Sequence, residues 1–140
     1  MILYLDTSAL VKLYVEEAES TTIAAAVERA AAVATARITY AEARAAFARH
    51  ARAGGLTAAE LRRVVRQFDE EWGQYSIVEV TDVLVRRAGA LAERHKLRGY
   101  DAVQLAAAVD VRLAGGAAVA FASFDARLSQ AARREHLDLL

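Results

Sequence analysis

The sequence predicts a three-layer α/β sandwich, in which a central, mostly parallel sheet lies between two layers of helices. Two observations lead to this prediction. Short apolar segments alternate with helical segments, and the 140 residues contain neither proline nor a low-complexity linker. Strands separated by helices pair in parallel through right-handed crossovers, which covers both faces of the sheet with helices. We therefore expect a single domain over residues 1–140 with its own core.

Local patterns place the elements along the chain. The expected strands cover residues 2–5, 32–36, 76–80 and 117–122, with an edge strand at 136–140. The expected helices cover about 8–14, 18–30, 39–54, 57–72, 82–96, 100–113 and 126–134. The segment 76–80 alternates in the manner of a strand, whereas 32–36 is so rich in alanine that its strand character is weak. Gly54 and Gly55 suit a helix C-terminus, and Thr57 with Glu60 has the spacing of a capping box.

Composition excludes several classes of protein. Hydrophobic residues make up 56% of the chain, which is too many for a disordered protein. There are no cysteines, so disulfides and thiolate metal sites are excluded. No apolar run approaches the roughly 18–20 residues of a membrane span, and the first residues resemble a strand rather than a secretion signal, so we expect a cytoplasmic protein without a membrane partner. The 18 basic and 18 acidic residues balance, which argues against tight non-specific binding of nucleic acid.

Four acidic residues fall where strands end or helices begin. Asp6 follows the first strand, Glu42 lies in the first turn of a helix, Asp101 starts another helix, and Asp125 follows the apolar strand at 117–122. The carboxyl ends of parallel strands lie along one edge of a sheet, where open α/β sheets bind ligands. We therefore expect these four carboxylates to share a pocket.

Each acid also has a purely structural explanation. Thr39 and Glu42 have capping-box spacing, and Asp101 or Asp125 would interact favourably with a helix dipole. Asp6 is harder to explain in this way, because a buried carboxylate at a strand end costs several kcal/mol unless it is paired.

A cluster of carboxylates predicts a hard divalent cation. Gathered carboxylates repel one another, and a cation removes that repulsion. Oxygen ligands without cysteine or a nearby histidine suit Mg²⁺ or Mn²⁺ rather than Zn²⁺ or Cu²⁺. Such an ion polarises a phosphoryl oxygen and lowers the pKa of an attacking water.

Four motifs carry a resemblance to a known family. They are LDTSALVK at 5–12, ITYAEA at 38–43, YDAVQLA at 100–106 and SFD at 123–125. In order and spacing they resemble the PIN-domain ribonucleases and, among these, the VapC toxins of toxin–antitoxin pairs. The resemblance extends over essentially the whole chain.

The resemblance implies a PIN-like fold and a metal-dependent endoribonuclease that cuts single-stranded or loop RNA. By the same resemblance, Asp6 and Asp101 are the main ligands of Mg²⁺ or Mn²⁺, and Glu42 and Asp125 complete the catalytic pocket. It further implies a homodimer and a cognate VapB-like antitoxin that blocks the pocket, often with an arginine.

Several hydroxyl groups accompany the acids. Thr7 or Ser8 is expected to cap the first helix and orient Asp6. Ser123 stands where the family often has threonine, and it keeps the hydroxyl.

The expected reaction is in-line attack on phosphorus by a metal-held water, which leaves a 5′-phosphate. Attack by the RNA 2′-hydroxyl would normally need a histidine or lysine acid–base pair, and the three histidines, His50, His95 and His136, lie outside every motif. We interpret them as surface or partly packed residues. Arg49, on the helix face of Glu42, and Arg127 are candidates for binding RNA phosphate, with surface ion pairs as the alternative.

Three other functions remain as alternatives. A PIN-fold nuclease outside a toxin–antitoxin system would act on another nucleic acid, although the chain lacks an extra clamp for structured DNA. A receiver-like signalling domain would need adjacent acids after the first strand, but Thr7 and Ser8 follow Asp6. A non-catalytic scaffold would not need all four acids.

Overall fold

Five strands form a parallel sheet in the computed structural model, which describes all 140 residues. The strands are β1 (Ile2–Leu5), β2 (Ala32–Ala36), β3 (Ser76–Val78), β4 (Val119–Ala122) and β5 (Asp138–Leu139). Their order across the sheet is β3-β2-β1-β4-β5, and every neighbouring pair is parallel. The predicted parallel sheet is therefore confirmed, including the alanine-rich strand β2.

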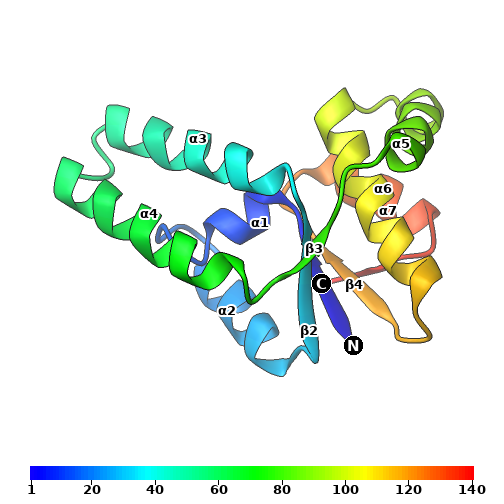
Figure 1. Ribbon diagram of the computed structural model, residues 1–140, viewed down its shortest axis with the longest axis horizontal. Helices are drawn as coiled ribbons and strands as arrows, with labels where there is room; N and C mark the ends of the chain where they lie inside the picture. Colours follow the sequence, from blue (N-terminus) through cyan, green and yellow to red (C-terminus); the bar gives the residue numbers. More distant parts are fainter.

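Seven helices form the two outer layers. They are α1 (Thr7–Val11), α2 (Ser20–Arg29), α3 (Thr39–Arg52), α4 (Ala58–Trp72), α5 (Asp82–His95), α6 (Gly99–Ala114) and α7 (Ala126–Arg134). Figure 1 shows α1 to α4 on one side of the sheet and α5 to α7 on the other. None of the helices combines the length and the hydropathy that crossing a bilayer requires.

Alternation along β1 builds a separate core on each face of the sheet. Leu3 and Leu5 pack in one hydrophobic cluster with Phe47 of α3, whereas Tyr4 packs in the other with Phe121 of β4. Successive side chains of a strand point to opposite faces, so this single buried strand contributes to both cores. All three β1 side chains are fully buried.

The observed boundaries differ from the expected ones mainly at strand ends. β3 ends at Val78 rather than residue 80, and β4 begins at Val119 rather than residue 117. The first helix is shorter than expected and ends at Val11. The capping box of Thr57 and Glu60 is confirmed at the start of α4.

The chain reverses its direction of progress across the sheet at β1. It runs from β1 through β2 to β3 on one side and then returns to β4, which pairs with the other side of β1. Such a reversal opens a crevice at the carboxyl ends of the two strands flanking it. Asp6 directly follows β1, and Asp125 comes shortly after β4, so the topology places both beside this crevice.

Candidate active site

A cavity of about 570 Å³ lies at the carboxyl edge of the sheet. All four predicted acids line it: Asp6, Glu42, Asp101 and Asp125. They come from segments far apart in the sequence, which the parallel topology brings to one edge. The expected shared pocket is therefore present.

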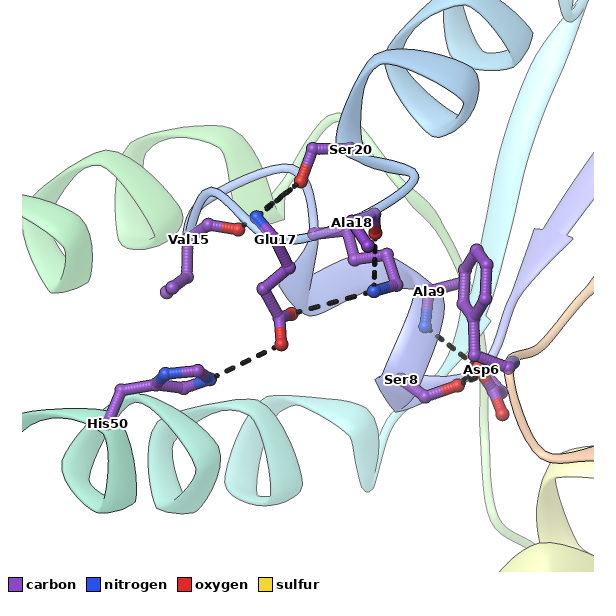
Figure 2. Close-up of polar contacts among 10 residues, drawn as sticks. Asp6, Ser8, Ala9, Val15, Glu17, Ala18, Ser20 and His50 are labelled. Carbon is purple, nitrogen blue, oxygen red and sulfur yellow. Dashed lines mark hydrogen bonds and ion pairs between the residues drawn. The ribbon is translucent and has the colours of Figure 1, made fainter. Parts of the chain in front are cut away.

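Asp6 is the most deeply buried of the four acids, with 4% of its surface exposed. Asp6 is itself the N-cap of α1, so the expectation that Thr7 or Ser8 caps this helix is wrong. Its Oδ1 accepts hydrogen bonds from the Ala9 N–H at 2.9 Å and the Ser8 hydroxyl at 2.7 Å (Figure 2). Burial raises the pKa of Asp6 to about 6, and the negative charge of Asp101 acts in the same direction. Hydrogen bonding from Ser123, Ser8 and Ala9 offsets part of this rise in the pKa. No basic side chain forms an ion pair with the Asp6 carboxylate.

Glu42 is held by side chains from two other helices. Its Oε1 accepts hydrogen bonds from the Thr7 hydroxyl at 2.7 Å and from Gln104 Nε2 at 2.8 Å. The capping box expected for Thr39 and Glu42 is wrong, because Ile38 is the N-cap of α3 and makes no side-chain cap bond. Thr39 is instead fully buried, and its hydroxyl accepts from Gln104 Nε2 at 3.0 Å.

Gln104 is a site residue whose role was not predicted from the sequence. Its side chain is buried, and its Oε1 accepts a 2.6 Å hydrogen bond from the buried Tyr4 hydroxyl while its amide donates to Glu42. A buried amide with several polar partners fixes the position of each of them. Its place three residues after Asp101 on α6 is the only sequence signal, since both then lie near one helix face.

Asp101 and Asp125 lie at the starts of two helices. Asp101 is in the first turn of α6, with Arg98 Nε 3.5 Å from its Oδ2. Asp125 is the N-cap of α7, and its Oδ1 accepts from the Leu128 N–H at 3.0 Å. Its own N–H donates to the Ser123 hydroxyl at 3.1 Å. Capping explains one oxygen of Asp125, and the side chain still lines the cavity.

Comparison with known proteins identifies the family. The PIN-domain family model matches residues 3–134, which is nearly the whole chain. This chain belongs to the PIN-domain family. Two proteins of Mycobacterium tuberculosis, Ribonuclease VapC45 and Ribonuclease VapC49, are each 39% identical to this PIN domain over 127 residues, covering 91% of this chain and 86% of theirs.

Solved structures show the same fold. A chain from the VapBC2 structure of Rickettsia felis, bound to a DNA fragment from the promoter, matches with a TM-score of 0.66 and 13% identity, over 100% of this chain and 98% of that one. A chain from VapBC-1 of nontypeable Haemophilus influenzae matches with a TM-score of 0.65 and 16% identity, over 100% and 97%. At this identity the likeness concerns the fold alone.

Basic side chains share the cavity of this PIN domain with the acids. Arg49, one of the two predicted RNA contacts, lines it, and so do Lys12, His50 and Arg98. Arg127 is exposed on α7 and is not among the lining residues. The cavity therefore has an acidic centre and basic side chains around it.

His50 and Glu17 are further site residues that the sequence did not single out. His50 Nε2 lies 3.7 Å from Glu17 Oε2, and both side chains are about one-third exposed at the cavity wall (Figure 2). The sequence analysis placed His50 outside every motif and interpreted it as a surface or partly packed residue. The turn between α1 and α2 brings them together, and no periodic pattern marks such a turn. His95, by contrast, lies outside the cavity with only 5% of its side chain exposed.

The donor chemistry of the cavity fits Mg²⁺ or Mn²⁺ with few protein ligands. No group of three or more His, Asp or Glu side chains lies close enough together to hold an ion. Mg²⁺ is commonly bound through one or two carboxylates, with water and substrate phosphate completing its octahedron. The unpaired Asp6 carboxylate and its neighbour Asp101 provide such a pair of oxygen donors.

Proposed function

We propose that this PIN domain is a divalent-metal-dependent endoribonuclease that cuts single-stranded or loop RNA. The observation that carries the proposal is the shared cavity, in which Glu42, Asp101 and Asp125 accompany the buried Asp6, a carboxylate without an ion-pair partner. The two M. tuberculosis relatives are named ribonucleases, which supports RNA as the substrate.

The proposed ligands are Asp6 and Asp101, with Glu42 and Asp125 completing the site. When bound, Mg²⁺ or Mn²⁺ supplies positive charge for the phosphoryl oxygens and lowers the pKa of a water. Ser8 and the Ala9 N–H hold Asp6 in place.

Other residues of this chain position the acids and the RNA. Thr7 and Gln104 keep Glu42 oriented by hydrogen bonds to one of its oxygens, and Ser123 fixes the turn that carries Asp125. Arg49 and Arg127 form no ion pair within the chain and are proposed to bind RNA phosphates.

A cleavage assay tests the nuclease proposal. Purified protein is incubated with a pool of single-stranded RNA in Mg²⁺, in Mn²⁺ and in EDTA. We expect cleavage with either ion, none in EDTA, and none with Asp101→Asn. Asp138→Asn serves as the matched control, because Asp138 is exposed on β5 and away from the cavity. Equal cleavage in EDTA would contradict the metal requirement, and full activity of Asp101→Asn would contradict the site.

We further propose that the protein is the cytoplasmic toxin of a VapBC-type pair and forms a homodimer. The VapC names of the relatives and the VapBC complexes among the structural matches support an antitoxin partner. A guanidinium from such a partner would pair with the carboxylates of the cavity.

Growth and light scattering test these assignments. Expression of the chain alone should slow growth, Asp101→Asn should not, and co-expression of a small upstream antitoxin should restore growth. Light scattering should give twice the mass of one chain. A folded, nuclease-active protein that leaves growth unchanged would contradict the toxin role, and a monomer would contradict the dimer.

A further inference from the structure

Phe124 is a large apolar side chain exposed at the edge of the acidic cavity. Phe124 follows Ser123 and precedes Asp125 in the sequence, is 44% exposed and lines the cavity. Phe121, three residues earlier, is fully buried in the core. A single exposed apolar residue is common on protein surfaces. The surroundings of Phe124 distinguish it from such a residue.

The backbone of Phe124 is tied to the acidic centre. Its N–H donates to the Ser8 hydroxyl at 3.0 Å, and the same hydroxyl donates to Asp6 Oδ1 at 2.7 Å. Two successive hydrogen bonds therefore link the Phe124 backbone, through Ser8, to Asp6, the most buried acid of the site.

A partly buried lysine lies against the aromatic ring. Lys12 Nζ is 4.4 Å from the ring centroid of Phe124, within the range of a cation–π contact. The Lys12 ammonium also donates to the Ala18 carbonyl at 2.7 Å and lies 4.0 Å from Glu17, and its side chain is 11% exposed. Figure 2 shows Ala18 and Glu17 on the turn that holds this ammonium. The arrangement fixes a positive charge beside an aromatic ring at the cavity wall.

We propose that Phe124 and Lys12 form a nucleotide subsite next to the acids: an unpaired base stacks on Phe124, and the adjoining phosphate binds Lys12. The inference rests on the proposed ribonuclease function and deepens it, because it names the part of the substrate that this wall binds. Exposed aromatic rings bind single-stranded RNA by stacking, which tolerates any base. In a cavity lined by several carboxylates, a fixed ammonium gives the phosphate backbone a point of attachment.

RNA binding in the uncleaving Asp101→Asn background tests the subsite. Two fluorescein-labelled probes are titrated by anisotropy: a pool of random single-stranded 12-mers, and an abasic ribose-phosphate 12-mer. Phe124→Ala should weaken binding of the random pool about tenfold, because one stacked base is lost. It should leave the abasic probe unaffected, and Phe124→Trp should retain affinity for the pool. Lys12→Gln should weaken both probes and lower the slope of log K against log salt by about 0.7, and Lys12→Arg should restore both.

Leu113→Ala is the matched control, because Leu113 is an exposed apolar residue at the end of α6, outside the cavity. Equal binding by the Phe124→Ala and Leu113→Ala proteins would overturn the stacking role. Equal weakening of both probes by Phe124→Ala would overturn it as well, since a merely structural effect does not distinguish bases. If Phe124→Ala and Lys12→Gln leave RNA binding unchanged while the parent chain still cleaves RNA, the subsite is wrong and the nuclease stands. Failure of the parent chain to bind or cleave any RNA would overturn both.

Discussion

The buried Asp6 carboxylate destabilises the metal-free fold when it is charged, whereas the proposed metal binding needs that charge. Because burial raises the pKa of Asp6 from 3.8 to about 6, the folded protein binds more protons than the unfolded chain between these pH values. The free energy of unfolding of the metal-free protein therefore falls as the pH rises through this window. In a functioning site a bound cation would remove that penalty.

Replacing Asp6 by asparagine should stabilise the metal-free protein at neutral pH. Asparagine keeps the N-cap acceptor for Ala9 and removes the buried charge. Above pH 6 we expect Asp6→Asn to raise the free energy of unfolding by up to about 3 kcal/mol, with no gain at pH values below 3.8. Urea denaturation in EDTA at several pH values measures this, with Asp138→Asn as the exposed control. A destabilised Asp6→Asn protein at pH 8 would show that the carboxylate is satisfied in the apo state.

Gln104 should matter for both folding and activity. Gln104→Leu keeps a similar volume but leaves the buried Tyr4 hydroxyl without its acceptor and removes one of the two donors to Glu42. We expect a loss of about 1–3 kcal/mol in the free energy of unfolding, together with reduced cleavage. Gln130→Leu on α7 is the control, since Gln130 is exposed. Unchanged stability and activity would mean that water replaces the amide.

The residues predicted from sequence are those whose position follows from an element boundary. Asp6 and Asp125 could be placed because each follows an apolar strand. Gln104 and Glu17 could not, because their roles depend on which side chains of other segments meet them. His50 lies on the same helix as Glu42, but only the fold of the α1–α2 turn gives it a partner.

At the scale of single elements, α7 provides a way to separate capping from chemistry. Asp125 accepts the Leu128 N–H at the start of this helix and also lines the cavity. Asp125→Asn keeps a capping acceptor, so stability should change little, whereas Asp125→Ala should cost about 1 kcal/mol. Both should reduce cleavage if the negative charge is used. Thermal melts paired with the cleavage assay distinguish the roles, and full activity of Asp125→Asn would leave Asp125 with the cap alone.

The sequence predicted which segments are helices and which are strands, but not the residues at which some of them begin or end. The strand β2 has little intrinsic preference for a strand, yet it lies between β1 and β3, where its last three residues are buried. Tertiary pairing thus outweighs weak propensity. The error at Thr39 has a similar origin, because its hydroxyl is taken by the Gln104 and Thr35 side chains rather than by the backbone of its own helix.

At the scale of the whole molecule, the arrangement of the strands creates the site. The return of the chain from β3 to β4 puts the ends of β1 and β4 side by side (Figure 1), and helices α3 and α6 bring Glu42 and Asp101 to the same cavity. The alternation of strands and helices was sufficient to predict the parallel layers. The sequence pattern does not encode which strand pairs with which, so the crevice between β1 and β4 required the structure.

The chemical nature of the RNA ends after cleavage distinguishes attack by a metal-activated water from attack by the RNA 2′-hydroxyl. If a water activated at the acidic site attacks phosphorus, the 2′-hydroxyl is not consumed, and the downstream fragment carries a 5′-phosphate. A phosphate-dependent 5′ exonuclease should then degrade that fragment, and mass spectrometry should find no 2′,3′-cyclic phosphate upstream. A 2′-deoxy substitution at the scissile nucleotide should weaken binding at most, because 2′-hydroxyls are contact points rather than reactants. A cyclic phosphate, formed by Asp101→Asn but not by His50→Ala, would contradict the account and move the chemistry from the carboxylates to the histidine.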